Sequence, residues 1–404
     1  MAPKGGSAAG SAIGGPFGCP DGHDSLTPAP HDNGGGRAGV LRLSSQFSTG
    51  PCRRSSCARA EGGDIVNSVK WRGVAVVSAV TAAVAGMAAV TSAPASAAPV
   101  REAPAYRVTD LGTLPGAPDS TAMGVNDRGD VVGQSGAHAV LWRNGRIVDL
   151  GTLGGSYSAA VDVNERGDVA GYSQVADGAG NHAFIWRGGR LIDLSPLPGF
   201  SSSYATAVND GGDVVGYSVG DGGISAVLWR PDGTAVDLTA ETGLHEVTDL
   251  DNAGRLVGSV MPDGMNGYPA LWYRGRLTVL SEMSGTASAI NDRGEITGYF
   301  YGGVGNSFMW RGGRLTEIPL LPDMPPASMM QAQGINNRGQ VVGFGGFDGF
   351  VWDSDTGTLS TLPGITRLGP AAYDINDRGQ IVGSAGTSPE NLEPHAVLLS
   401  PQHH

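Results

Sequence analysis

Three histidines at equivalent places in a repeated sequence are the first candidates for chemistry. His138, His182 and His395 each open a short apolar stretch, and the imidazole nitrogen is a common metal ligand and general base. Three such histidines hold one metal ion only if they face a common axis. Other hydrogen-bonding side chains take their place in the remaining copies: Ser225, Tyr268, Asn306 and Asp348. The pattern favours a hydrogen bond at the start of a strand, and it predicts no metal site.

Carboxylates recur in turns of the form Asn-Asp-x-Gly, which look like fragments of calcium loops. Calcium takes about six to eight oxygen ligands, whereas each turn offers one or two carboxylates. We therefore expect the Asn side chain to bond within its own turn. The segment 353–357, Asp-Ser-Asp-Thr-Gly, is closer to a calcium loop but lacks a distant bidentate Glu, so it predicts a hairpin.

The zinc-protease motif H-E-x-x-H and the phosphate loop G-x-x-x-x-G-K-[ST] are both missing from the sequence. We therefore assign no catalytic residue and expect no cofactor.

Composition separates the two ends of the 404-residue chain. Its cysteines, Cys19, Cys52 and Cys57, all lie near the N-terminus, so no disulfide framework is expected beyond them. From Ala98 onward the chain contains 18 arginines, no lysine, and 33 Asp and Glu residues. This acidic balance argues against nucleic acid or an anionic membrane as a partner.

The first hundred residues are expected to precede the folded domain, as an extension, a signal peptide and a linker. Residues 1–65 have no apolar period and predict a disordered or untranslated extension, with translation starting near Val66 or Val69. Residues 66–97 have the three parts of a secretory signal peptide, ending at Ala95-Ser96-Ala97. The alternative is a retained membrane anchor, since the 18-residue apolar run 73–90 is at the lower limit for spanning. We expect cleavage after Ala97, a linker over 98–104, and a secreted product.

A repeat of about 42 residues organises the chain beyond residue 105. Its leading Asn or Asp is followed by glycines three and seven residues later, as in Gly129 and Gly133. The seven copies begin at Asn126, Asn164, Asn209, Asp251, Asn291, Asn336 and Asn376. A second block ending in tryptophan follows in six copies, and its fixed place predicts packing between repeats.

Each repeat contains four short strand-like runs joined by tight turns. In the first copy these are 122–125, 130–133, a run from His138 to Trp142, and 146–150. Four antiparallel strands per repeat make one blade, so the chain predicts an all-β, seven-bladed β-propeller over 105–400, followed by a tail at 401–404. The last copy lacks its fourth strand, and we expect residues 106–111 to pair with 395–399 and close the ring.

The repeat resembles the HAF repeat, named for the stretch that appears here as His182-Ala183-Phe184. The resemblance covers about residues 105–400 and includes the Asn-Asp-Arg-Gly turns. It implies an extracellular repeat protein and supplies no reaction or catalytic residue.

Loops of variable length follow the second and fourth strands, whereas the other turns are short and repetitive. Such loops on a rigid scaffold usually carry binding specificity, so we place the ligand site on their face, near the axis. Acids such as Asp177, Asp221 and Asp263 are expected beside aromatic side chains there. The predicted ligand-binding aromatics are Tyr157, Phe200, Tyr204, Tyr268, Tyr301 and Phe347.

The function that these observations favour is a secreted, monomeric module that binds an extracellular glycan, cell-wall polymer or protein. One alternative is a propeller hydrolase or lyase acting on polysaccharide or a cell-envelope polymer. It requires ionisable residues from different blades to converge in one pocket. A second alternative is a structural surface-interaction protein, which would present a flat loop face.

Overall fold

A computed structural model describes residues 105–402, except 177, 179, 302–306, 322–323, 325–328, 347, 364–370 and 387–392. The predicted extension 1–65, signal peptide 66–97 and linker 98–104 lie outside the described residues. Within the described part of the chain, no helix is long and apolar enough to cross a membrane.

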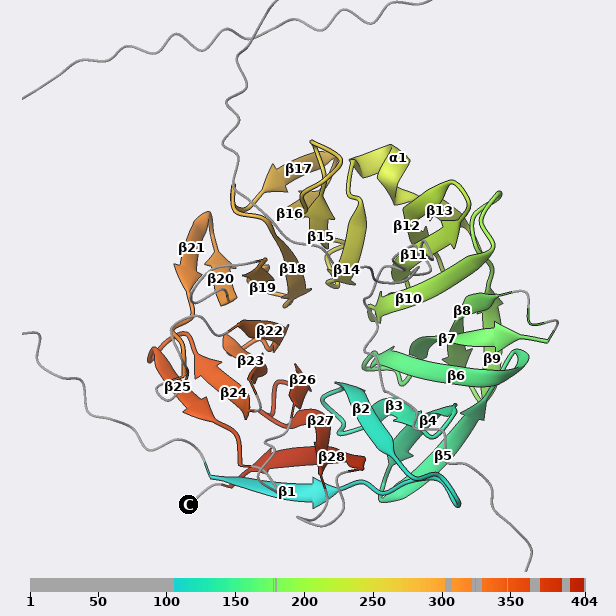
Figure 1. The fold of residues 1–404 in the computed structure, drawn as a ribbon, viewed down its shortest axis with the longest axis horizontal. Coiled ribbons are helices and arrows are strands. Elements are labelled where there is room, and N and C mark those ends of the chain that lie inside the picture. Colours follow the sequence, from blue (N-terminus) through green and yellow to red (C-terminus); the bar gives the residue numbers. More distant parts are fainter. Residues whose placement is uncertain are drawn as a thin grey trace, which may run out of the picture. The chain divides into compact units, whose positions relative to one another are not determined.

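The described strands form seven four-stranded antiparallel sheets, arranged as blades around one axis (Figure 1). Blade one comprises β2 (Ser120–Val125), β3 (Val131–Ser135), β4 (His138–Arg143) and β5 (Arg146–Gly151). Blade two comprises β6 (Gly154–Val163), β7 (Val169–Val175), β8 (Asn181–Arg187) and β9 (Arg190–Leu194). Blade three comprises β10 (Ser202–Val208), β11 (Val214–Gly220), β12 (Gly223–Trp229) and β13 (Ala235–Asp237).

The remaining blades repeat this order. Blade four comprises β14 (Glu246–Leu250), β15 (Leu256–Val260), β16 (Tyr268–Tyr273) and β17 (Arg276–Val279). Blade five comprises β18 (Gly285–Ile290), β19 (Ile296–Phe300), β20 (Ser307–Arg311) and β21 (Arg314–Glu317). Blade six comprises β22 (Met330–Ile335), β23 (Gln340–Gly345), β24 (Asp348–Asp353) and β25 (Thr358–Thr361).

Blade seven joins the two ends of the repeat region. It contains β26 (Ala371–Ile375), β27 (Ile381–Gly386) and β28 (Pro394–Pro401), and its outer strand is β1 (Tyr106–Asp110). β1 runs antiparallel to β28, from the pair Tyr106–Pro401 to the pair Asp110–Val397, and the two lie side by side in Figure 1. The predicted all-β fold, its seven blades and its closure by the N-terminal strand are confirmed.

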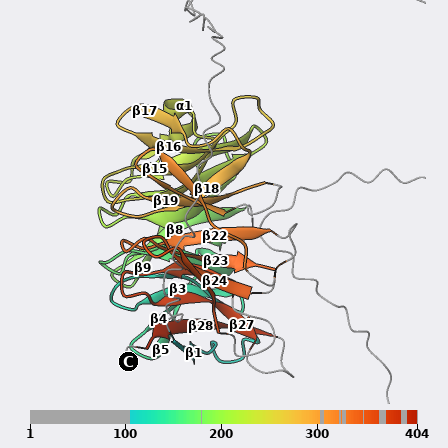
Figure 2. The same cartoon turned by 90° about the vertical axis from the view of Figure 1, so that its left-hand side faces the viewer.

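Seen from the side, the blades form a disc with turns and loops at its two faces (Figure 2). We call the face with the Asn turns the turn face. The opposite face, with the links between second and third strands and between blades, is the loop face. The one helix among the described residues, α1 (Leu238–Thr242), follows β13 and is capped at its N-terminus by Asp237.

The two recurring glycines have different physical roles. Gly129 has φ +80°, the left-handed conformation that the turn needs. Gly133 lies opposite Ala122, and a Cβ there would overlap the carbonyl oxygen of Thr121. A β-bulge between Ala122 and Gly124 accompanies this close approach, and all seven innermost strands carry it at the equivalent place.

The core lies between adjacent blades. Trp142 packs with Val382 and Ala396 of blade seven, and Trp229 packs with Ile185 of blade two. The predicted packing of tryptophans between repeats is thereby confirmed. The segment 353–357 forms the β24–β25 hairpin, as predicted, and Asp353 accepts hydrogen bonds from its own turn.

Candidate functional site

The turn-face end of the axis is built from the Asn turns, which link each blade to the next. In the first turn, Asn126 Oδ1 accepts from the main-chain N–H groups of Arg128 and Asp130, at 3.1 and 3.0 Å. Its Nδ2 donates to the carbonyl oxygen of Asn164 in the next blade, at 3.0 Å. The expected bond of the Asn side chain within its own turn is confirmed, and the same side chain also joins two blades.

Blade four departs from this pattern at both ends of its turn. Asp251 replaces the leading Asn, and its side chain has no N–H to donate. Arg255 lies at the position where the first blade has Asp130. The Arg255 guanidinium pairs with the Asp251 carboxylate and reaches across to the carbonyl oxygen of Asp292 at 2.7 Å. The arginine therefore supplies the inter-blade donor that the aspartate lacks.

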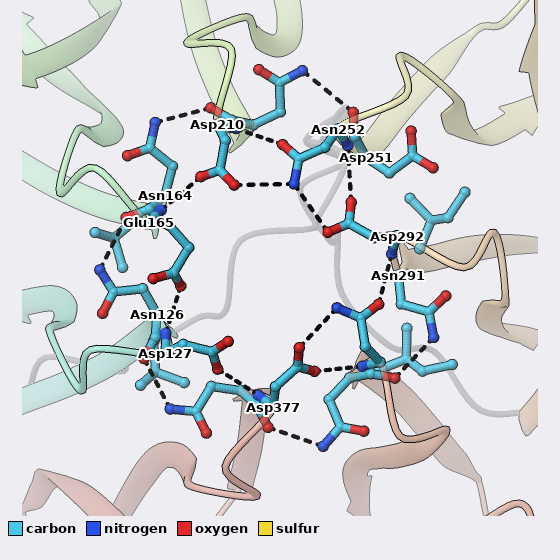
Figure 3. Close-up of a pocket in the computed structure, with 18 of the residues that line it drawn as sticks. Asn126, Asp127, Asn164, Glu165, Asp210, Asp251, Asn252, Asn291, Asp292 and Asp377 are labelled. Carbon is cyan, nitrogen blue, oxygen red and sulfur yellow. Dashed lines mark hydrogen bonds between the residues drawn. The ribbon is translucent and has the colours of Figure 1, made fainter.

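The residues after the leading Asn or Asp form a closed ring around the axis, shown in Figure 3. At each step a main-chain N–H donates to the side-chain oxygen of the next blade, starting with Asp127 to Glu165 at 2.6 Å and ending with Asp377 to Asp127 at 2.7 Å. We call this the acidic ring. Its members are Asp127, Glu165, Asp210, Asn252, Asp292, Asn337 and Asp377.

Charge is unevenly spread in the acidic ring, which borders a cavity of about 240 Å³. Asn252 donates its amide to Asp210 and Asp292, whereas Asp127, Glu165 and Asp210 follow one another with no amide between them. Burial, with the neighbouring carboxylates Asp127 and Asp210, raises the pKa of Glu165. The hydrogen bonds of the acidic ring connect each blade to the next. In the described part of the chain, no group of three or more His, Cys, Asp or Glu side chains is placed to hold a metal ion.

Three further carboxylates lie deeper along the axis, one in each of blades two, four and seven. We call Asp162, Asp249 and Asp374 the axial carboxylates; they line a second cavity of about 220 Å³. Each accepts a main-chain N–H from its own blade and one from the next, as Asp374 does from Ile375 at 2.7 Å and Val125 at 2.9 Å.

Burial dominates the electrostatics of the axial carboxylates. It raises the pKa of Asp162 and, together with the charge of Asp162, raises the pKa of Asp249 well above its usual value. The same two causes raise the pKa of Asp374 to about 7. Simultaneous ionisation of all three carboxylates is therefore disfavoured at this level of the axis, and each carboxylate connects two blades.

At the loop-face end of the innermost strands, tyrosines of blades two and three form a continuous row. Tyr157 and Tyr172 have ring centroids 6.1 Å apart, Tyr172 meets Tyr204 of the next blade edge-on at 5.0 Å, and Tyr204 stacks on Tyr217 at 5.1 Å. All four rings are half-buried. We call these residues the tyrosine row.

Hydrogen bonds fix the orientation of the tyrosine row. The Tyr157 hydroxyl donates to Gln134 Oε1 at 3.0 Å, and the Tyr204 hydroxyl accepts from Asn181 Nδ2 at 2.9 Å. Burial raises the pKa of Tyr217 to about 12, so this ring stays neutral at ordinary pH. Rigid, partly exposed rings of this kind stack on a ligand at little entropic cost.

Five of the six predicted aromatics are among the described residues, and they lie in different surroundings. Tyr157 and Tyr204 belong to the tyrosine row, and Tyr301 is 47% exposed beside Tyr299 of blade five. Phe200 and Tyr268 pack against the cores between blades. Phe347 lies outside the described residues.

Of the three acids expected beside these aromatics, Asp177 lies outside the described residues. Asp221 is exposed, and Asp263 caps its own turn by accepting the main-chain N–H groups of Met265 and Asn266. These hydrogen bonds lower the pKa of Asp263 to about 2.

Sequence reasoning missed Tyr172, Tyr217, Tyr299 and Glu246. The first three occupy one position of the repeat, eight residues after its leading Asn. An alignment of the seven copies could have found them, because this position is aromatic in a fourth copy as well, at Phe344.

The recurring histidines lie far from the axis and pair with the outermost strand of their blade. His138 Nδ1 lies 2.8 Å from Asp149, His182 Nδ1 lies 2.9 Å from Asp193, and His395 pairs with Asp110 of β1 at 3.0 Å. Their predicted role as hydrogen bonders at the start of a strand is confirmed.

Comparisons with known proteins support the fold and indicate no function. No family model and no curated protein matches the chain. The extracellular domain of BT3049 from B. thetaiotaomicron is similar with a TM-score of 0.51 and 11% identity over 74% of this chain and 41% of that one. The extracellular domain of BT4673 from the same organism gives 0.49 and 10% over 74% and 40%, and YCF48 bound to D1 peptide gives 0.47 and 14% over 76% and 99%. The chain thus spans about two fifths of the extracellular domains that it matches.

Proposed function

We propose that this protein is an exported propeller that binds an extracellular glycan or cell-wall polymer at the axial end of its loop face. The observation that carries the proposal is the tyrosine row, four neighbouring rings contributed by two blades. Half-buried tyrosine rings present flat apolar surface with polar edges, which suits the faces and hydroxyls of sugar rings.

Export is part of the proposal and rests on the sequence. Residues 66–97 have the features of a cleaved signal peptide, and the repeat resembles the HAF repeat of extracellular proteins. The BT3049 domain, which shares the fold, is extracellular. After cleavage the propeller acts as a monomer free of the membrane, and its excess of acids over arginines makes nucleic acid an unfavourable partner.

A glycan and cell-wall polymer array, probed with the secreted protein, tests the proposal. We expect a hit whose affinity falls about five- to tenfold in Tyr204→Ala, since stacking on one aromatic ring contributes about 1 to 1.5 kcal/mol. Tyr273→Ala is the matched control, because that tyrosine packs beside Arg274 at the end of β16 nearest the turn face.

Other outcomes of the array would overturn parts of the proposal. A glycan that binds and is then degraded on incubation would show that the protein is an enzyme, as in the hydrolase or lyase alternative. No glycan hit, together with binding to a protein array, would move the ligand class to proteins. Equal loss of affinity in both tyrosine variants would show that the tyrosine row is not the site.

A further inference from the structure

Glu246 is the one charged side chain at the level of the tyrosine row. This level consists, in each described blade, of one residue of the innermost strand and its partner on the second strand. Glu246 pairs with Ser259 in blade four, where blade three has Tyr204 and Tyr217. Uncharged residues occupy the equivalent pairs of the other blades: Thr121–Gln134, Ala159–Tyr172, Thr286–Tyr299, Gln331–Phe344 and Ala371–Ser384.

Tyrosines of the two neighbouring blades surround this carboxylate. Tyr217 ends the tyrosine row on the blade-three side, and Tyr299 and Tyr301 lie on the blade-five side. The last two rings meet nearly at right angles, with centroids 5.9 Å apart and an interplanar angle of 74°. After burial, the charge of Glu246 is the next largest cause that raises the pKa of Tyr299 and Tyr301, which places the carboxylate within electrostatic reach of both.

The carboxylate is largely desolvated and lacks a strong cationic partner. Ser259 Oγ donates to it at 3.2 Å, Thr286 of blade five also forms a side-chain hydrogen bond with it, and His245 precedes it in the chain. Among the described residues no arginine forms an ion pair with Glu246. Burial raises the pKa of Glu246 because the ionised form loses hydration that these contacts do not fully replace.

An organic ammonium group fits this arrangement of one carboxylate among aromatic rings. Ring faces attract cations, by about 0.5 to 2 kcal/mol, and a buried carboxylate gains from a charge-assisted hydrogen bond. The acidic excess of the chain also raises the local concentration of cations near it.

We infer that the ligand is a polysaccharide with free amino groups, whose sugar rings stack on the tyrosine row and whose ammonium group binds Glu246 between Tyr217 and Tyr299. The inference rests on the proposed function and names the ligand class for that same site. Tyr217 connects the two parts, because it stacks on Tyr204 and also lies within electrostatic reach of Glu246. A neutral glycan would use the tyrosine row and leave the carboxylate unpaired.

The test compares two oligosaccharides of equal length that differ only in the amine: oligomers of glucosamine and of N-acetylglucosamine. Titration calorimetry near neutral pH should show that the glucosamine oligomer binds about tenfold more tightly or better, the effect of one hydrogen bond to a charged group. Added salt should reduce this preference, since it screens the charge on a partly exposed pair.

Variants separate the carboxylate from the rings. Glu246→Gln should bring the two affinities within about twofold of each other while binding of the N-acetylglucosamine oligomer persists, because the amide keeps the shape and loses the charge. Glu282→Gln removes an exposed acid in the link between blades four and five and should keep the full preference. Urea unfolding of Glu246→Gln confirms that the variant is folded.

The outcomes distinguish this inference from the proposed function. Equal affinity for the two oligomers in the unmodified protein would overturn the ammonium site and leave the glycan site standing. Failure of both oligomers and of every array glycan to bind would overturn both. A preference for the glucosamine oligomer that survives Glu246→Gln would place the cation elsewhere and overturn the assignment of Glu246.

Discussion

The main-chain N–H of Asp377, in the last blade, donates to the carboxylate of Asp127, in the first blade, at 2.7 Å across 250 residues of sequence. This bond completes the acidic ring on the turn face. The β1–β28 pairing closes the ring of blades at its outer edge. The first and last blades are thus joined both at the axis and at the rim.

The bond between Asp377 and Asp127 predicts different effects for two substitutions of Asp127. Asp127→Ala removes the acceptor and should lower the free energy of unfolding by about 1 to 2 kcal/mol. Asp127→Asn keeps an acceptor oxygen and relieves repulsion with Glu165, so its stability should match or exceed that of the unmodified protein. Urea unfolding measures both, and equal destabilisation by the two substitutions would contradict the role of Asp127 as an acceptor.

The Asp251–Arg255 pair predicts a rescue. Arg255→Ala leaves a buried carboxylate without its partner and should cost about 3 kcal/mol or more. The double variant Asp251→Asn with Arg255→Asp restores the arrangement of blade one and should recover stability to within about 1 kcal/mol. Thermal or urea unfolding of the single and double variants checks this. A double variant no more stable than Arg255→Ala would show that the two positions are not exchangeable as a pair.

The axial carboxylates predict that stability falls as the pH rises towards neutrality. Burial, followed by the charge of Asp162, raises the pKa of Asp374 to about 7 in the folded protein, above that of a free aspartate. Its contribution is therefore fully present below about pH 4 and is lost as the pH passes through about 7.

Asp374→Asn tests this pH dependence. The variant cannot ionise, so its free energy of unfolding should change less between mildly acidic and neutral pH than that of the unmodified protein. It should also be less stable in acid by about 1 to 3 kcal/mol, since the amide NH₂ cannot accept from the main-chain N–H that the lost oxygen served. An unchanged slope of stability with pH would refute the assignment.

The close approach at Gly133 predicts that even one methyl group is not tolerated there. Gly133→Ala puts a Cβ against the carbonyl oxygen of Thr121 and should destabilise the fold by about 1 to 3 kcal/mol or more. Gly222→Ala is the matched control, because a Cβ there meets nothing within 4 Å and φ is not positive. Thermal unfolding compares them, and equal stability would show that β2 and β3 can move apart.

Several features of this protein follow from its sequence. The leading Asn or Asp and the glycine three positions later recur seven times and the tryptophan block six times, so these local signals predict the hairpins and the number of blades. Closure follows as well, because the fourth strand missing after Leu399 has a counterpart at Tyr106. These predictions hold because turn chemistry and strand alternation act over a few residues.

Only the tertiary structure brings together residues from different blades around the axis. The acidic ring needs each side chain to reach the main chain of the preceding blade, about 40 residues away in sequence, and the bulge after Ala122 sets which positions face the axis. For the same reason Glu246 is unremarkable in the sequence but stands among the tyrosines of two neighbouring blades. Phe200 and Tyr268 are loop-side aromatics in the sequence, and only the tertiary structure shows that they pack, half-buried, against the cores between blades.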